Sequence, residues 1–269
     1  MHKSQTGEDF WNRNKNIIIN KYNNGESLSD IAKEYHCYGS TIGYKLKEWG
    51  IPRHERYNNI YNINSEYFNN INTEHKAYWY GLLLSDGHVN CNAITISIRE
   101  RYILDEFRKD LDTNIPIREN YYKLPTLTIA NKHMCNSLNT KGFNHQKSKY
   151  IDINKVKNFI PDNLENHFIR GMFDGDGSIK YYKYDYQDTI MLHFGYTGTE
   201  EVVAYIKDKF DIKNKIVQEG KYTQTVVSSN PNKIKEIYHY LYRDATIWIN
   251  RKRNTFEDIF KIRGIEYEK

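Results

Sequence analysis

Residues 168–177 read Phe-Ile-Arg-Gly-Met-Phe-Asp-Gly-Asp-Gly, and residues 77–87 read Ala-Tyr-Trp-Tyr-Gly-Leu-Leu-Leu-Ser-Asp-Gly. Each stretch is an apolar run typical of a helix, with small residues four positions apart, and each ends in Asp-Gly. Small residues at that spacing clear one helix face, so two such helices can pack unusually closely. The closing glycine suits the left-handed conformation that commonly ends a helix. The pattern therefore predicts two helices that contact each other along their small residues.

The aspartates of these two stretches are the first candidates for chemistry. Asp86 and Asp176 come at the negative end of each helix dipole, where a carboxylate is unfavourable unless a cation is present. If the helices pack side by side, the two carboxylates meet at one end of the seam. They would then form an oxygen-rich site for a hard divalent cation such as Mg²⁺, with Ser85 and Gly175 as the adjoining metal-site positions.

The two stretches resemble the paired motifs of the LAGLIDADG homing endonucleases, in the single-chain form with two pseudo-symmetric halves. The segment 167–180 is a close match, whereas the first copy has Leu84 and Ser85 where the family often has Asp and Ala. The essential acidic residue, second from the end, is present in both copies as Asp86 and Asp176. The competing interpretation is two unrelated buried helices that both end in Asp-Gly, and two copies in a matching context argue against it.

The context of the motif repeats along the chain. After the first copy, Ile94, Ile96 and Ile98 alternate with polar residues, and after the second, Ile190, Leu192 and Phe194 alternate with Met191 and His193. Such alternation predicts a half-buried strand. Helical stripes, strand-like segments and a further helix then follow in the same order in both halves, at 103–111 and 202–210, around 115–129 and 215–229, and near 132–141 and 232–243.

This repetition predicts an α+β fold built by internal duplication. The expected architecture is two pseudo-symmetric αββαββα half-domains, at 74–162 and 163–269, packed through the motif helices. Their antiparallel sheets would form a saddle over the carboxylate pair.

The polar faces of the predicted sheets are candidates for DNA contact. A two-stranded ribbon or shallow sheet fits the major groove, where short polar side chains read base edges and Arg and Lys hold phosphates. A solvated sheet face is the commoner explanation, and the saddle is favoured because two halves would place it over the carboxylates. The candidate residues are Thr95, Ser97, Arg99, Arg118, Thr126, Thr128, Lys221 and Gln224.

Residues 17–54 predict a separate helical module, assigned to 1–56 and followed by a linker at 57–73. Ser27 is a good N-cap, with Asp30 in the capping-box position, and after a turn at 36–39 Ser40 is expected to cap a further helix that ends at Gly50.

This order resembles the helix-turn-helix of resolvases and sigma-like regulators, although any small helical bundle has a similar periodicity. In a helix-turn-helix, the second helix of the motif enters the major groove. The residues that would face the groove are Ser40, Thr41, Tyr44, Lys45 and Lys47.

Lys147 and Lys252 are the next candidates, each in the segment after the helix that closes its half. The family resemblance implies one basic residue per half near the metals, where it polarises water or offsets transition-state charge. The alternative is that these lysines hold phosphates at a distance or are simply solvated. Arg251 and Arg253, beside Lys252, are further candidate DNA contacts, and Lys132 and Lys233 are possible substitutes for the lysines.

Metals shared between two carboxylates activate water and stabilise the leaving oxygen of a phosphodiester. The resemblance implies a site-specific double-strand DNA endonuclease from a mobile genetic element. It would be a monomer acting as a pseudo-dimer on a long duplex site, with Mg²⁺ as cofactor and Mn²⁺ as a substitute. Two alternatives stay open: an intron-splicing maturase that binds RNA, and a non-catalytic DNA-binding transcriptional regulator of the same fold. The presence of both aspartates argues against the regulator, and the helix-turn-helix favours duplex DNA over RNA.

Composition agrees with this interpretation without deciding it. The chain has 39 Lys and Arg against 34 Asp and Glu, a net charge of +5, which is compatible with nucleic acid. The three cysteines are odd in number and lack metal-ligand spacing, which indicates reduced thiols. No signal peptide or membrane span is predicted, so the expected location is the cytoplasm of a microbe or infected host, or an organelle matrix, and not the exterior of the cell.

Overall fold

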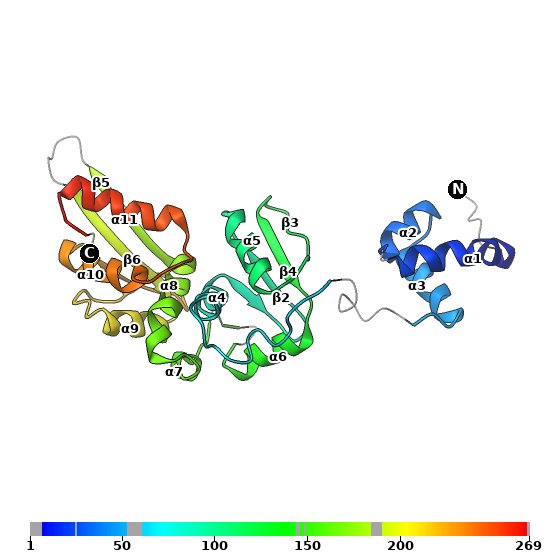
Figure 1. Ribbon diagram of the computed structural model, residues 1–269, viewed down its shortest axis with the longest axis horizontal. Coiled ribbons are helices and arrows are strands. Elements are labelled where there is room, and N and C mark those ends of the chain that lie inside the picture. Colours follow the sequence, from blue (N-terminus) through cyan, green and yellow to red (C-terminus); the bar gives the residue numbers. More distant parts are fainter. Residues whose placement is uncertain are drawn as a thin grey trace. The chain divides into compact units, whose positions relative to one another are not determined.

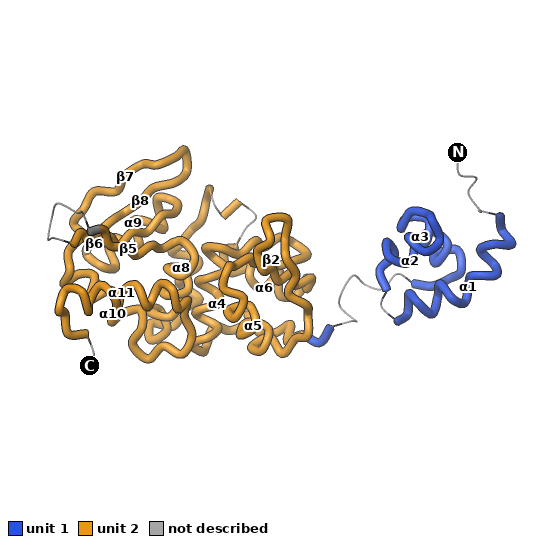
Figure 2. The backbone as a smooth tube through the Cα atoms, turned by 90° about the horizontal axis from the view of Figure 1, so that it is seen from above, with its two compact units in different colours: residues 1–62 blue, residues 63–269 orange. Residues whose placement is uncertain are grey.

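The structure, a computed structural model, describes residues 7–24, 26–52, 61–143, 146–147, 149–183 and 190–267. The chain divides into two compact units, residues 1–62 and 63–269 (Figure 2). Residues 57–60 of the predicted linker lie outside the described residues, whereas its remainder, 61–73, is described. The division of the second unit at residue 162 stays a prediction. Within the described residues, no helix has both the length and the apolar character needed to cross a membrane.

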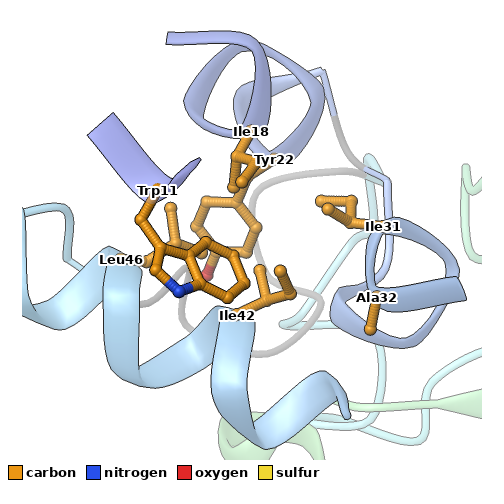
Figure 3. Close-up of a cluster of buried hydrophobic side chains, with 7 residues drawn as sticks. All are labelled: Trp11, Ile18, Tyr22, Ile31, Ala32, Ile42 and Leu46. Carbon is orange, nitrogen blue, oxygen red and sulfur yellow. The ribbon is translucent and has the colours of Figure 1, made fainter. Parts of the chain in front are cut away.

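In its described residues, the small unit has three helices packed around one apolar cluster (Figure 3). The helices are α1 (Glu8–Asn23), α2 (Leu28–Glu34) and α3 (Gly39–Glu48). The buried cluster contains Trp11, Ile18, Tyr22, Ile31, Ala32, Ile42 and Leu46. The predicted cap of α2 is confirmed, because the Asp30 amide donates to Ser27 Oγ at 3.1 Å. The predicted cap at Ser40 is wrong: α3 begins at Gly39, after Tyr38, and Ser40 is left as an exposed residue inside the first turn.

The large unit contains two halves with the same order of elements, αββαββα, which confirms the predicted α+β class. The first half consists of α4 (Glu74–Ser85), β1 (Gly87–Val89), β2 (Ile94–Ser97), α5 (Arg101–Asp110), β3 (Arg118–Glu119), β4 (Pro125–Ile129) and α6 (Lys132–Thr140). The second consists of α8 (Glu165–Asp176), β5 (Gly177–Lys183), β6 (Ile190–Gly198), α9 (Glu200–Lys209), β7 (Val217–Gln218), β8 (Gln224–Ser228) and α10 (Pro231–Tyr242). Between the halves lie α7 (Ile153–Lys157) and the 3₁₀ turn η1 (Asp162–Leu164), and α11 (Asn250–Arg263) follows α10.

The two four-stranded sheets are antiparallel and have equivalent strand orders, β1-β2-β4-β3 and β5-β6-β8-β7. One face of each sheet is apolar. In the first sheet Ile96 lies opposite Leu127, and both are buried. In the second, Phe194 is buried and its ring stacks on Phe173 of α8 with centroids 5.5 Å apart. The alternation in the sequence therefore becomes the sheet faces that cover the helices.

The motif helices α4 and α8 lie side by side between the two sheets (Figure 1). Both are buried along nearly their whole length, and α4 accordingly has no amphipathic pattern. The strands β1 and β5 begin directly after these helices, so each sheet starts at the end of the seam.

Candidate active site and nucleic-acid interface

The seam between α4 and α8 depends on one glycine from each helix. A Cβ atom at Gly81 would lie 2.0 Å from the backbone oxygen of Phe168, and one at Gly171 would lie 2.0 Å from that of Tyr78. Backbone atoms cannot rotate away as a side chain can, so only glycine fits at these crossing points. The predicted contact of the two helices along their small residues is confirmed.

The glycines that close the two motifs have a different role from the one expected. Gly87 and Gly177 begin strands, and neither has the left-handed conformation that was predicted for a helix end. A Cβ at Gly177 would lie 2.0 Å from the Phe173 ring, and one at Gly87 would lie 2.6 Å from the Leu83 carbonyl oxygen. Close packing against the preceding helical turn, and not φ, requires glycine here.

Asp86 and Asp176 occupy equivalent places at the ends of α4 and α8. Both side chains are accessible to solvent, but protein atoms surround them closely enough to raise their pKa values. The pKa of Asp176 is raised to about 6, chiefly by partial desolvation and then by the negative charge of Asp86. Desolvation also raises the pKa of Asp86, against the opposing charges of Lys252 and Lys147. The structure thus brings the two carboxylates into one electrostatic site that a cation would stabilise.

Lys252 belongs to α11, and its side chain reaches the C-terminal end of α8. It is almost completely buried. Its Nζ donates to the backbone oxygens of Phe173, Asp174, Gly175 and Gly177, at distances between 2.6 and 3.1 Å. The last carbonyls of a helix have no partner within the helix and carry its negative dipole end, so an ammonium group is favoured there. Burial nevertheless lowers the pKa of Lys252 to about 8.

Lys147 has the equivalent position at the end of α4. Its Nζ donates to the backbone oxygens of Leu84 at 2.7 Å and Ser85 at 2.5 Å. Desolvation lowers its pKa, while the charges of Asp176 and Asp86 act in the opposite direction. The structure therefore brings both predicted lysines to the aspartates, one in each half. The substitutes Lys132 and Lys233 instead lie at the N-terminal ends of α6 and α10.

The residues around the two carboxylates fit a hard divalent cation. Besides the carboxylate oxygens, the backbone oxygens of Ser85 and Gly175 are nearby, although each already accepts a bond from a lysine. Within the described residues there is no group of three or more His, Cys, Asp and Glu that could form an all-protein cage. Two carboxylates would supply oxygen ligands of the kind that Mg²⁺ takes, and water would have to complete its coordination shell.

A cleft of about 200 Å³ opens beside Asp176, and residues of both halves line it. Its lining includes Lys147, Thr197, Thr199 and Thr223, together with apolar residues such as Met172 and Val202.

Sequence reasoning missed a set of buried charges along the seam. Arg170, inside the second motif, is completely buried, and its guanidinium donates to Glu74 of α4 at 2.8 Å and to the backbone oxygen of Ile247 at 2.8 Å. This ion pair joins the two halves at the start of α4. An arginine within an otherwise apolar motif was the signal in the sequence, but its partner lies 96 residues away.

A second missed residue is Asp174, which is buried two positions before Asp176. It accepts hydrogen bonds from the Tyr78 hydroxyl and the Ile249 amide, both at 2.8 Å. Burial raises the pKa of Asp174 to about 6. The first motif has Leu84 at the equivalent position, so the two halves of the site are chemically different.

The polar residues predicted on the first sheet share one open face. Thr95 lies opposite Thr128, and Ser97 lies opposite Thr126, with a hydroxyl contact of 2.7 Å in the second pair. Arg118 is exposed on β3 opposite Thr126. Two further residues belong with this set: the predicted Arg99 is exposed just beyond β2, and His88, which the sequence analysis missed, is exposed opposite Thr95.

The second sheet differs from the expectation. Gln224 alternates with Thr225 along β8 and shares its face with the buried Val226. Its predicted place on the open face is therefore wrong, because a shift of one residue in a strand moves a side chain to the other face. Lys221 is exposed in the turn before β8, with its Nζ 5.1 Å from the ring centroid of Tyr222. The open face of this sheet instead carries Ser178, Lys180, Tyr182, Met191, His193 and Thr197.

The arginines beside Lys252 are already engaged in ion pairs. Arg251 Nε lies 3.1 Å from Glu100 Oε1, and Arg253 Nε lies 2.8 Å from Glu257 Oε1. The Arg253 guanidinium also lies over the Trp248 ring, 4.2 Å from its centroid. Arg253 therefore packs within the second half, whereas Arg251 remains largely exposed.

On the small unit, the predicted groove-facing residues of α3 fall into two groups. Ser40, Tyr44 and Lys47 are exposed, whereas Thr41 and Lys45 are half-buried. Lys45 contacts Glu48 at 2.9 Å and lies over the ring of Trp11, so its ammonium group is not free.

Comparison with solved structures shows the fold of the chain. The LAGLIDADG homing endonuclease I-LtrWI, bound to target DNA, matches with a TM-score of 0.50 at 11% identity, covering 76% of this chain and 92% of that protein. The meganuclease I-SmaMI, bound to uncleaveable DNA, matches with a TM-score of 0.52 at 11% identity, over 71% of this chain and 91% of that protein. I-CpaMI, a LAGLIDADG meganuclease bound to uncleaved DNA, matches with a TM-score of 0.50 at 10% identity, covering 71% of this chain and 92% of that protein.

No protein-family model matches the sequence, and no curated protein does either. The chain thus has the LAGLIDADG homing endonuclease fold, as the motifs predicted, with a sequence that has diverged widely from the solved examples.

Proposed function

We propose that this protein is a site-specific, metal-dependent DNA endonuclease that cuts both strands of a duplex. The observation that carries the proposal is the pairing of Asp86 and Asp176 at the end of the glycine seam, with Lys147 and Lys252 beside them. Solved structures of the same fold are DNA complexes of homing endonucleases, which supports duplex DNA as the substrate.

Asp86 and Asp176 would hold Mg²⁺, or Mn²⁺ in its place. When bound, the cation supplies activation of water and stabilisation of the leaving oxygen. The two carboxylates must be ionised for this, and their mutual repulsion favours cation binding over the empty site. Lys147 and Lys252 fix the ends of α4 and α8 and add positive charge beside the scissile phosphates. Two similar half-sites account for one cut in each strand.

The open faces of the two sheets begin at the aspartates and would carry the DNA. Hydroxyl pairs such as Ser97 with Thr126 offer donors and acceptors to base edges, and Arg99 and Arg118 offer charge to phosphates. The α3 face of the small unit, with Ser40, Tyr44 and Lys47, would add contacts outside the central site.

The test is cleavage of a plasmid library of randomised targets, with Mg²⁺ and with EDTA. The wild-type chain is compared with the Asp86→Asn/Asp176→Asn double variant. Asp258→Asn serves as the matched control, because this carboxylate is exposed on α11. We expect metal-dependent double-strand cuts at one recurring sequence in the wild type and the control, and none in the double variant.

Each remaining outcome identifies an alternative. Tight duplex binding without cutting in any chain would refute the nuclease and favour a DNA-binding regulator. Preference for folded RNA would favour a maturase, because RNA has a deep, narrow major groove that the open sheets would not read in the same way. Removal of residues 1–56 is expected to weaken target affinity and leave cleavage intact.

A further inference from the structure

The hairpin β5–β6 extends much farther from its aspartate than its counterpart β1–β2. In the first half, β1 ends at Val89, three residues after Asp86. In the second half, β5 continues to Lys183, seven residues after Asp176, and remains paired with β6 over this length. The second sheet therefore has a long arm for which the pseudo-symmetry of the halves provides no reason.

The open face of this arm ends in an apolar pair. Ile179 and Leu192 are buried on the covered face, so the residues that alternate with them point away from the helices. Tyr182 and Met191 are directly opposite each other on that open face, and 47% and 49% of their surfaces are exposed. The exposed halves of these two large side chains, in register on an open sheet face, form a small apolar patch that is available to a partner.

The surroundings of the pair favour DNA as its occupant. The next pair inward on the same face is Lys180 opposite His193, and Lys180 adds a positive charge to the arm. The strand β5 starts immediately after Asp176, so the patch is continuous with the proposed DNA-binding face. A two-stranded ribbon of this kind fits the major groove, where the one apolar feature of a base pair is the 5-methyl group of thymine.

We propose that Tyr182 and Met191 contact thymine methyl groups in the major groove of one half-site only. Tyr182 is six residues beyond Asp176, which corresponds to about 20 Å of strand and to about six base pairs at about 3.4 Å per step. This inference rests on the duplex binding in the proposed function, but not on cleavage.

The first sheet supports the restriction to one half-site. Its open face carries the hydroxyl pairs Thr95 with Thr128 and Ser97 with Thr126, and these small polar side chains take the place of a large apolar pair. Since β1 ends at Val89, this sheet has no strand pair at the distance that Tyr182 and Met191 reach. The DNA target should therefore present contacted thymine methyl groups in one half-site and not in the other.

The experiment uses binding, so that it does not depend on nuclease activity. The Asp86→Asn/Asp176→Asn chain selects duplexes from a random pool, and each thymine of the selected duplex is then replaced by deoxyuridine. Uracil keeps the hydrogen-bonding groups of thymine and lacks the methyl. We expect about fourfold weaker binding for each contacted methyl removed, the value for burying one methyl-sized group. The affected positions should lie about six base pairs from the centre of the target, in one half-site only.

Two variants in this background separate the apolar pair from general effects. Met191→Gln, similar in size but polar, should lose the thymine preference at the position that Met191 contacts and keep it at the position that Tyr182 contacts. Tyr181→Ser is the matched control, because Tyr181 is 41% exposed but alternates with Tyr182 and so lies on the other face. It should keep the preference for thymine.

Two results would overturn the inference while leaving DNA binding in place. One is equal affinity for the thymine and uracil duplexes in the unsubstituted chain. The other is a Met191→Gln chain whose preference for thymine is unchanged at every position. Failure to select any duplex would refute the proposed function and this inference together.

Discussion

Replacing Gly171 by alanine should destabilise the large unit, because the seam has no room for a methyl group. A Cβ at Gly171 would lie 2.0 Å from the Tyr78 backbone oxygen, where ordinary contact begins at 3.4 Å, so the two helices must separate by about 1.4 Å. Overpacking of a core costs about 1–3 kcal/mol, and a contact with backbone belongs at the upper end of that range. Alanine regains up to about 1 kcal/mol of helix propensity over glycine. The expected net loss is about 2 kcal/mol, or about 30-fold in the folding equilibrium.

Urea unfolding of the full chain would measure this loss as a shift of the midpoint at constant slope. Gly220→Ala is the control, since that glycine lies in the β7–β8 turn and a Cβ there would meet nothing closer than 3.7 Å. Its stability should remain within about 0.5 kcal/mol of the wild type. A Gly171→Ala variant as stable as this control would refute the close approach of α4 and α8.

The double variant Gly81→Ala/Gly171→Ala tests the same geometry more sharply. Each new methyl group would meet the backbone of the facing helix at 2.0 Å. A single separation of the helices relieves both contacts, so the double variant should lose less stability than the sum of the two single losses. Strict additivity would mean that the two glycines act at independent sites.

Three further outcomes follow from the charges around the seam. Cleavage should decrease as the pH falls through about 6, because the raised pKa of Asp176 means that its carboxyl becomes protonated there and loses cation affinity; a rate independent of pH between 5 and 7 would contradict this. Lys252→Met should lower the melting temperature more than Lys147→Met, since it leaves four carbonyls without their partner instead of two; equal shifts would argue against the described contacts. Arg170→Met should cost about 3–5 kcal/mol in urea unfolding because it leaves Glu74 without its ion-pair partner, and most of that loss should be recovered when Glu74→Gln is added.

The fold was predictable from the sequence because its main signals are local. The spacing of the small residues identified the two seam helices, and the alternation of Ile94, Ile96 and Ile98 identified a strand with one buried face. The helix expected near 132–141 is α6, Lys132–Thr140. The repetition of these patterns predicted the pseudo-symmetry, because a duplicated order of elements can be recognised in a sequence without knowledge of its tertiary contacts.

The predictions that were wrong or missing concern contacts between distant residues, or a strand register that changes with a shift of one residue. Gly177 is required by the Phe173 ring and not by its own backbone angle. Gln224 and Thr225 are equally polar, so composition alone does not decide which of them lies on the face with the buried Val226. The partner of Arg170 is Glu74, in the other half, and the sequence contains no signal that joins them.

The difference between Asp174 and Leu84 bears on how far the duplication extends to the chemistry. Asp174 accepts the Ile249 amide immediately before α11, which anchors the helix that carries Lys252. Leu84 has no such acceptor in its side chain, and Lys147 lies in a short segment and not on a helix. The two lysines thus reach equivalent helix ends from unlike supports, with four carbonyl partners on one side and two on the other. The local electrostatic field at each aspartate depends on these contacts. Equal topology in the two halves therefore does not entail equal reactivity toward the two DNA strands of the proposed substrate.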